Sequence, residues 1–321
     1  MQNTTSYNKR LNINELNNTT NLEEAIKNAE HLYISNLLGD EELLSSINSY
    51  LKKYNKKLWL SLNKSTEMNQ ENLKQLRYLT NVKKLKIIVF NGFIEDLSEL
   101  SHIDDLEEFT IYDNVKKGIS LVPLAKFKNL SSLSLYTGLT IKQYAVLNTF
   151  EKLEHLSARE IDFSKLNNLP IKELTVNNKV IHNELIIEKF PDIEYISLQN
   201  CKDVSIENIG SLPVLSDVRL RYMPHITRLT SFKNKENIFH FECVHLKNLE
   251  NIEALFELKQ LKYLMITDLE KLKAEDFYRL EELLNLKVAY ITFKNAKEND
   301  KFITFANAHN WIYKQPSLVG G

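Results

Sequence analysis

A nine-residue pattern recurs along this chain and constrains its fold more than any other feature. In the copy IEYISLQNC, which spans Ile193–Cys201, apolar residues stand at the first, fourth and sixth positions and a cysteine stands at the ninth. Residues two apart on a β-strand point to the same side, so the fourth and sixth residues share one face. One copy is too small to bury that face alone, so the copies must stack into a continuous core.

The fourth position of the pattern can be followed through twelve copies. Successive copies lie 22 to 27 residues apart, except for a single step of 18 residues. Steps of this length predict a parallel sheet in which each strand is followed by a short return segment. We place the fourth positions at Leu32, Leu58, Leu85, Phe109, Leu133, Leu156, Leu174, Ile196, Val218, Phe241, Leu264 and Ile291.

The length of each step predicts the form of its return segment. Two long early steps hold residues 41–53 and 69–79, which have the character of helices, and Asn21 is placed to cap an earlier helix that leads into a first strand at Leu32. The step of 18 residues has no room for a helix. Residues 167–170 should therefore turn directly into the next strand.

The repeats fill most of the chain. Residues 1–20 are polar and rich in Asn and Thr, which is typical of a flexible arm, and the solenoid is expected over residues 21–297 with about twelve repeats, including an N-terminal cap. Residues 298–315 predict a helix and a strand that cap the open end of the core, because an exposed apolar end would aggregate. Residues 316–321 are expected to form a tail.

Through this spacing and its number of copies, the chain resembles leucine-rich repeat proteins over residues 22–297, and the copy at 261–269 is similar to the short bacterial kind. The resemblance implies an α/β solenoid with a curved parallel sheet on its concave side and short α- or 3₁₀-helical returns on its convex side. It also implies a regulatory adaptor or a cytoplasmic immunity protein that blocks a toxin.

The ninth position departs from the family pattern, in which it is usually Asn. It is Asn only at Asn114, and Cys201 fills it in the copy described first. We therefore expect the ladder that family Asn side chains make to the backbone to be sparse.

Composition narrows the classes of partner. Forty-one basic and 42 acidic residues give a formal net charge of −1, so no global field attracts nucleic acid or an anionic membrane. Two cysteines exclude a disulfide framework, the first ten residues lack the apolar core of a secretory signal, and no run approaches the roughly 18 apolar residues of a membrane span. We expect a cytoplasmic monomer that binds a protein, and neither nucleic acid nor membrane.

No catalytic signature is present. The sequence contains no P-loop, dinucleotide-binding, zinc-protease or nucleophile-elbow motif, so we expect no enzyme activity, no cofactor and no metal site. Two alternatives stay open. One is an improvised active site around His155, Arg159 and Glu160 or around His240 and Glu242, and the other is nucleic-acid binding through Arg219 and Arg221.

Function is expected on the solvent side of the sheet, at the third, fifth, seventh and eighth positions of each copy. Tyr and Arg gather there, and both are enriched at the energetic centres of protein interfaces. A plain solvated sheet face is the alternative, with Arg219 simply paired to Glu242 on the next strand. The predicted protein-binding residues are Tyr112, Tyr136, Arg159, Tyr195, Asp217, Arg219, Arg221, Tyr222, His240, Glu242 and Tyr263.

Overall fold

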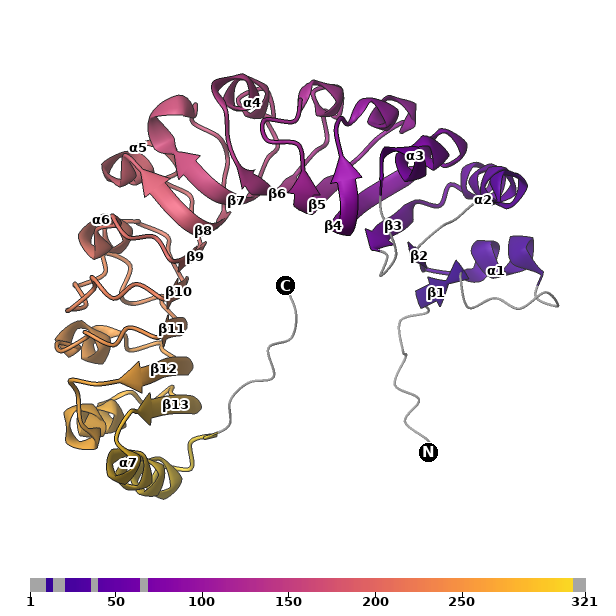
Figure 1. The fold of residues 1–321 in the computed structure, drawn as a ribbon. Coiled ribbons are helices and arrows are strands. Elements are labelled where there is room, and N and C mark those ends of the chain that lie inside the picture. Colours follow the sequence, from indigo (N-terminus) through magenta and orange to yellow (C-terminus); the bar gives the residue numbers. More distant parts are fainter. Residues whose placement is uncertain (1–9, 14–20, 36–39, 64–68, 314–321) are drawn as a thin grey trace, which may run out of the picture. The chain divides into compact units, whose positions relative to one another are not determined.

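The computed structural model describes residues 10–13, 21–35, 40–63 and 69–313 (Figure 1). The chain forms two compact units, residues 1–158 and 159–321, which are described separately below. Thirteen strands are found in the described residues, each followed by a return to the next, and the strand pairs are parallel.

The first unit contains six strands in chain order, each hydrogen-bonded to the next. They are β1 (Arg10–Asn12), β2 (His31–Ser35), β3 (Leu58–Asn63), β4 (Val82–Ile94), β5 (Glu108–Val115) and β6 (Ser132–Gly138). The division between the units falls within β7 (His155–Asp162). The returns are α1 (Leu22–Asn28), α2 (Glu41–Lys53), α3 (Gln70–Leu73), η2 (Lys74–Tyr78), η3 (Ser98–His102), η4 (Val122–Leu124) and α4 (Ile141–Leu147), all on one side of the sheet (Figure 1).

The second unit repeats this plan from β8 to β13. Its strands are β8 (Glu173–Ile181), β9 (Tyr195–Gln199), β10 (Asp217–Arg221), β11 (His240–Val244), β12 (Tyr263–Leu269) and β13 (Val288–Phe293). Its returns are η5 (Phe163–Lys165), η6 (Asn183–Leu185), α5 (Ile186–Lys189), α6 (Ile206–Gly210), η7 (Glu253–Glu257), η8 (Ala274–Glu282) and α7 (Ala296–Ala308). The expected parallel sheet with short α and 3₁₀ returns on one side is therefore confirmed within each unit (Figure 1).

The predicted return segments agree closely with the structure. Helix α2 spans the predicted 41–53, and the Asn21 side chain caps α1 by accepting a hydrogen bond from the Glu24 N–H. The stretch 69–79 is only half α-helical, since α3 passes into the 3₁₀-helix η2. The short step after β7 holds the three-residue 3₁₀-helix η5 and no α-helix, as expected.

Strand β1 corrects the expectation of a flexible arm over residues 1–20. Leu11 pairs with Leu32 on β2, so the first strand of the sheet lies ahead of the one placed at Leu32. The segment is too short and too polar for its alternation to stand out from the sequence. The rest of the predicted arm and the predicted tail lie outside the described residues.

The register of three repeats also differs from the expectation. Ile34 and Leu60, rather than Leu32 and Leu58, lie in register with Leu85. The final copy is shifted by two residues as well, since Leu264 pairs with Ala289 and Ile291 pairs instead with Ile266. A shift of two preserves the side to which every side chain points, so the assignment of faces survives.

The core is formed by the fourth, sixth and ninth positions together with the returns. In the opening copy, Ile196, Leu198 and Cys201 are all buried, as expected, and Met223, Leu246 and Leu269 occupy the same ninth place without an Asn ladder. The backbone replaces that ladder. The eighth residue in each of four successive copies adopts the left-handed conformation, which turns the ninth residue inward, and these residues are Asn200, Tyr222, His245 and Asp268.

Helix α7 covers the last strand. Phe302 and Ala306 of this helix are buried, and Trp311 packs on Phe305 with ring centroids 5.5 Å apart. Ile312 then forms a parallel bridge with Val288 and donates its N–H to the Lys287 carbonyl. The edge of β13 is thus partly paired, which limits its ability to recruit another strand.

Candidate protein-binding surface

The uncovered side of the second unit's sheet carries most of the residues predicted to bind a partner. Strand register sets them in two rows. The first row runs Tyr195, Asp217, His240 and Tyr263, and the second runs Ser197, Arg219, Glu242, Met265 and Tyr290. We call Tyr195, Asp217, Arg219, Arg221, His240, Glu242 and Tyr263 the charged cluster.

Arg219 is held by its own strand and by an aromatic neighbour. Its Nε and Nη2 atoms donate to the two carboxylate oxygens of Asp217 at 3.1 and 3.0 Å, which is a bidentate pair. Its guanidinium carbon lies 4.9 Å from the ring centroid of Tyr195. Burial acts to lower the pKa of Arg219, but the hydrogen bonds and charge of Asp217 outweigh it and the pKa is raised. Arg219 is therefore a fixed cation.

Arg221 and Glu242 form the second ion pair of the cluster. The Nε and Nη2 atoms of Arg221 lie 2.8 and 2.7 Å from Glu242 Oε1. The sequence hypothesis paired Glu242 with Arg219, which is its register partner, yet Arg219 Nε lies 4.0 Å from the nearest Glu242 oxygen. Arg219 is bound instead by Asp217, two residues away on the same strand, so Glu242 forms its short ion pair with Arg221.

Glu242 is only 4% exposed, although its position was expected to face solvent. Side chains on adjacent strands stand about 5 Å apart, so large neighbours on an inner sheet face cover one another. Burial acts to raise the pKa of Glu242. His240, Arg221 and Arg219 together outweigh that effect and hold the pKa below its ordinary value of 4.5.

His240 lies between two carboxylates and an aromatic ring. Its Nδ1 is 3.6 Å from Asp217 Oδ2, its Nε2 is 3.9 Å from Glu242 Oε2, and its ring stacks on Tyr263 with centroids 4.2 Å apart. Nε2 is buried and has no hydrogen-bond partner among the described residues. Burial, with the charge of Glu242, raises the pKa of the Tyr263 phenol to about 12.

Tyr222 belongs to a neighbouring ladder rather than to the cluster. It is 44% exposed, and its ring stacks on His245 with centroids 4.6 Å apart. His245 Nδ1 in turn lies 2.8 Å from Asp268 Oδ2. These three left-handed residues are among those that line an open hollow of about 420 Å³, and Arg221 and Glu242 line it as well.

In the first unit, the predicted residues Tyr112 and Tyr136 lie side by side with ring centroids 4.2 Å apart. Burial comes first among the causes that raise the pKa values of both phenols. Arg159, the first residue of the second unit, is exposed. The structure thus gathers seven of the eleven predicted residues into the charged cluster and pairs two others.

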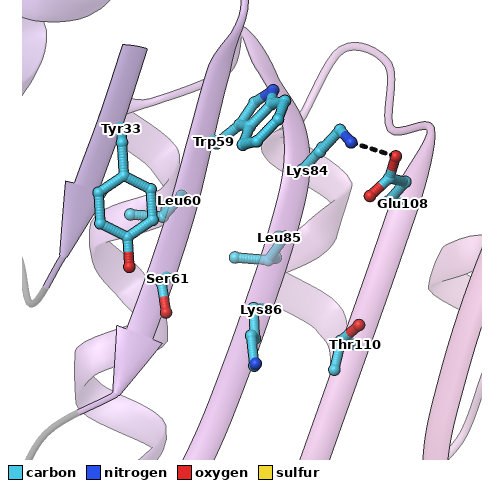
Figure 2. Close-up of a pocket in the computed structure, with 9 residues that line it drawn as sticks. All are labelled: Tyr33, Trp59, Leu60, Ser61, Lys84, Leu85, Lys86, Glu108 and Thr110. Carbon is cyan, nitrogen blue, oxygen red and sulfur yellow. Dashed lines mark ion pairs between the residues drawn. The ribbon is translucent and has the colours of Figure 1, made fainter. Parts of the chain in front are cut away.

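Sequence reasoning missed a hollow of about 370 Å³ over β2 to β5 (Figure 2). The Lys84 Nζ lies 4.1 Å from the ring centroid of Trp59 and forms an ion pair with Glu108, while Lys86 stands free of that pair in the same hollow. The signal was the alternation Leu58-Trp59-Leu60, which turns Trp59 away from the core.

The remaining chemistry is sparse. No group of three or more His, Cys, Asp or Glu side chains in the described residues is arranged to hold a metal ion. Cys201 and Cys243 are buried free thiols, and burial raises the pKa of Cys201 to about 12 and also raises the pKa of Cys243. No helix in the described part of the chain has both the length and the apolar character needed to cross a membrane.

Comparison with known proteins gives distant matches among solved structures. No family model matches the chain. A leucine-rich repeat protein of Leptospira interrogans is similar at 15% identity and a TM-score of 0.43, with 95% of each chain covered. An internalin of Listeria monocytogenes is similar at 14% identity and a TM-score of 0.39, with 92% of this chain and 82% of that chain covered. Internalin C2 of the same species gives 16% identity and a TM-score of 0.35, covering 79% and 84%.

At these identities and scores, the fold assignment rests on the chain's own geometry. Strand follows strand in register at intervals of little more than twenty residues, and the fourth, sixth and ninth positions are buried. Most returns contain a short α- or 3₁₀-helix, and the return from β10 to β11 consists of turns without a helix. Each of the two units has the architecture of a leucine-rich repeat array.

Proposed function

We propose that this chain is a non-catalytic scaffold that binds a protein partner on the uncovered sheet face of its second unit. The observation that carries the proposal is the charged cluster. Its two arginines are already fixed by ion pairs with Asp217 and Glu242, and its His240 and Tyr263 rings are already stacked. Side chains that are ordered before binding lose less conformational entropy on binding, which favours affinity.

The pattern of charge supports a protein partner over nucleic acid. Arg219 and Arg221 could form the core of a phosphate-binding patch, but each already faces a carboxylate within 3.1 Å. Tyr and Arg, which the charged cluster contains, are among the residue types enriched at protein interfaces. Duplex binding depends instead on cations that are free to neutralise phosphates.

The same geometry speaks against an active site around His240 and Glu242. A general base near neutral pH needs a raised carboxylate pKa, whereas the pKa of Glu242 is lowered and its Oε1 is bound by Arg221. Either an adaptor or an immunity protein that masks a toxin would use the surface as a rigid binding face. In the cytoplasm, where we place the protein, its two free thiols would stay reduced.

The test begins with isolation of the partner by co-purification from native cells and its identification by mass. The double substitution Arg219→Ala with Tyr195→Ala should then weaken the purified complex by a few kcal/mol, about a hundredfold in Kd, in a calorimetric titration. A matched control is Arg228→Ala with Tyr278→Ala, which removes the same residue types from the exposed surface of the same unit outside the charged cluster. Equal Kd values for the two double variants would refute this assignment of the face.

A further inference from the structure

Strand β4 contains a bulge that the repeat pattern does not predict. Val89 pairs with Asp113 and Ile94 pairs with Val115, so residues 90–93 of β4 lie opposite the single residue Asn114. Gly92 in this bulge has a φ of 100°, which a residue with a side chain rarely adopts. The sequence therefore favours this bulge, because it places glycine at the one bulge residue whose backbone conformation other residues rarely adopt.

Two phenylalanines project from this bulge into solvent. Phe90 is 58% exposed and Phe93 is 46% exposed. The backbone that presents them is anchored on both sides, because Asn114 Nδ2 donates to the Phe90 carbonyl at 3.2 Å and the Lys116 N–H donates to the Ile94 carbonyl at 2.9 Å. Large apolar side chains held outward on an anchored bulge indicate a contact surface rather than a packing defect.

The apolar surface continues from the bulge along the uncovered face of the sheet. Ile88, two residues before Phe90, pairs in register with Tyr112, and the Tyr112 ring packs against Tyr136. Ile88, Tyr112 and Tyr136 are all half-buried. The bulge and these three side chains together form an aromatic band across β4, β5 and β6.

A row of hydroxyl groups around one lysine borders the band. Ser35, Ser61, Lys86, Thr110 and Ser134 occupy the same register position on β2 to β6. Ser61, Lys86 and Thr110 line the hollow that also contains Trp59 (Figure 2). Lys84 is neutralised by Glu108, whereas Lys86 has no ion-pair partner among the described residues, and its Nζ lies 5.6 Å from the Tyr112 ring centroid. The row therefore presents one uncompensated positive charge among hydroxyl donors.

We propose that this face of the first unit binds an acidic, aromatic segment of a protein partner. A carboxylate of that segment would be bound by Lys86 and the hydroxyls of Ser61 and Thr110. Its apolar side chains would cover Phe90, Phe93 and the Ile88–Tyr112 pair. Successive register rows on the same face are about 7 Å apart along the strand, so an acidic residue and an apolar residue close together in the partner can reach both sites.

The face favours a protein segment over a membrane surface. Lys86 lines a hollow over β2 to β5, and the carboxylate in that hollow, Glu108, is turned toward Lys84 (Figure 2). A flat anionic bilayer could reach the two phenylalanines but not the lysine and the hydroxyl row. An extended side chain from a peptide can reach both.

This inference rests on the proposed scaffold function and adds the chemistry of the partner. It involves residues of the first unit, whereas the proposed function involves the charged cluster of the second unit, so an experiment can refute one without refuting the other. Random peptides displayed on phage are selected on the full-length protein. The selected peptides should combine Asp or Glu with large apolar or aromatic residues. Phe90→Ser with Phe93→Ser should weaken them at least about tenfold, while Val122→Ser, which alters another exposed apolar side chain in the same unit, should not.

Reversing the charge of Lys86 provides a second, independent test. Lys86→Glu should lose the acidic peptides and gain affinity for the same peptides with Lys in place of the acid, while Arg219→Ala with Tyr195→Ala should leave peptide binding unchanged. Failure to enrich acidic, apolar peptides, or equal binding by the Phe90/Phe93 double variant, would overturn the inference. Sedimentation with phosphatidylcholine vesicles containing phosphatidylserine that depends on the two phenylalanines would replace it with a membrane contact.

Discussion

The imidazole of His240 lies against the ring of Tyr263 on the next strand, with centroids 4.2 Å apart and planes inclined by 27°. The two residues are exact register partners on β11 and β12. Their contact covers the His240 ring on one side, while Asp217 and Glu242 approach its two nitrogens. One stacked pair therefore links the aromatic and the charged parts of the candidate surface.

Removing this stack should cost stability without disturbing the core. We expect Tyr263→Leu to lower the free energy of unfolding by about 0.5–1.5 kcal/mol relative to Tyr263→Phe, because only phenylalanine preserves the ring contact. Urea denaturation followed by circular dichroism measures the difference. Equal midpoints for the leucine and phenylalanine variants would show that the stack contributes nothing.

The Glu242 carboxylate should contribute more to the free energy of unfolding than an exposed carboxylate on a sheet face would. Glu242→Gln leaves Arg221 half-buried with a neutral partner, and we expect a loss of about 1–3 kcal/mol in the free energy of unfolding. Glu236→Gln, at an exposed position of the same unit, is the matched control and should change little. The prediction fails if both variants unfold at the same urea concentration as the parent.

Stability should also depend on pH through Glu242. Burial acts to raise its pKa, and the facing His240, Arg221 and Arg219 outweigh burial, so the folded-state pKa lies below the ordinary 4.5. A lowered folded-state pKa contributes stability above the unfolded-state value, and that contribution disappears as the pH falls through the folded-state pKa.

The difference in unfolding free energy between the parent protein and Glu242→Gln should therefore be constant near neutral pH and shrink as the pH falls below about 4.5. Urea titrations over that range measure it. The subtraction cancels other carboxylates whose pKa is also lowered, such as Asp162 and Glu207. A difference that stays constant to low pH would exclude this linkage.

The repeat pattern was sufficient to predict the strands from β2 onward, their faces and the short return after β7, but not β1. Alternation fixes which side a residue faces, and this information is local, so Ile196 and Leu198 could be assigned to the core without a structure. The register of the end repeats was less secure because their equivalents are atypical. Ala289 fills a place that Leu264 fills in the preceding copy, and its small side chain gave no leucine to align.

The candidate surface was predictable in location but not in its contacts. Register placed Arg219 beside Glu242, yet the choice between Asp217 and Glu242 depends on side-chain torsions that a sequence does not specify. The Phe90–Phe93 bulge was missed for a related reason. It interrupts the alternation that made the strands visible, and only Gly92 marks it.

The two thiols should be unreactive in the folded protein. Cys201 and Cys243 are fully buried at core positions of two copies separated by one other copy, and burial raises both thiol pKa values, that of Cys201 to about 12. At pH 8 neither forms an appreciable amount of the thiolate that reacts with a disulfide reagent. We expect no colour with Ellman's reagent in buffer and two thiols per chain in denaturing urea. Single Cys201→Ser and Cys243→Ser variants assign each signal, and rapid labelling of either thiol under native conditions would mean that its repeat opens independently of the rest of the array.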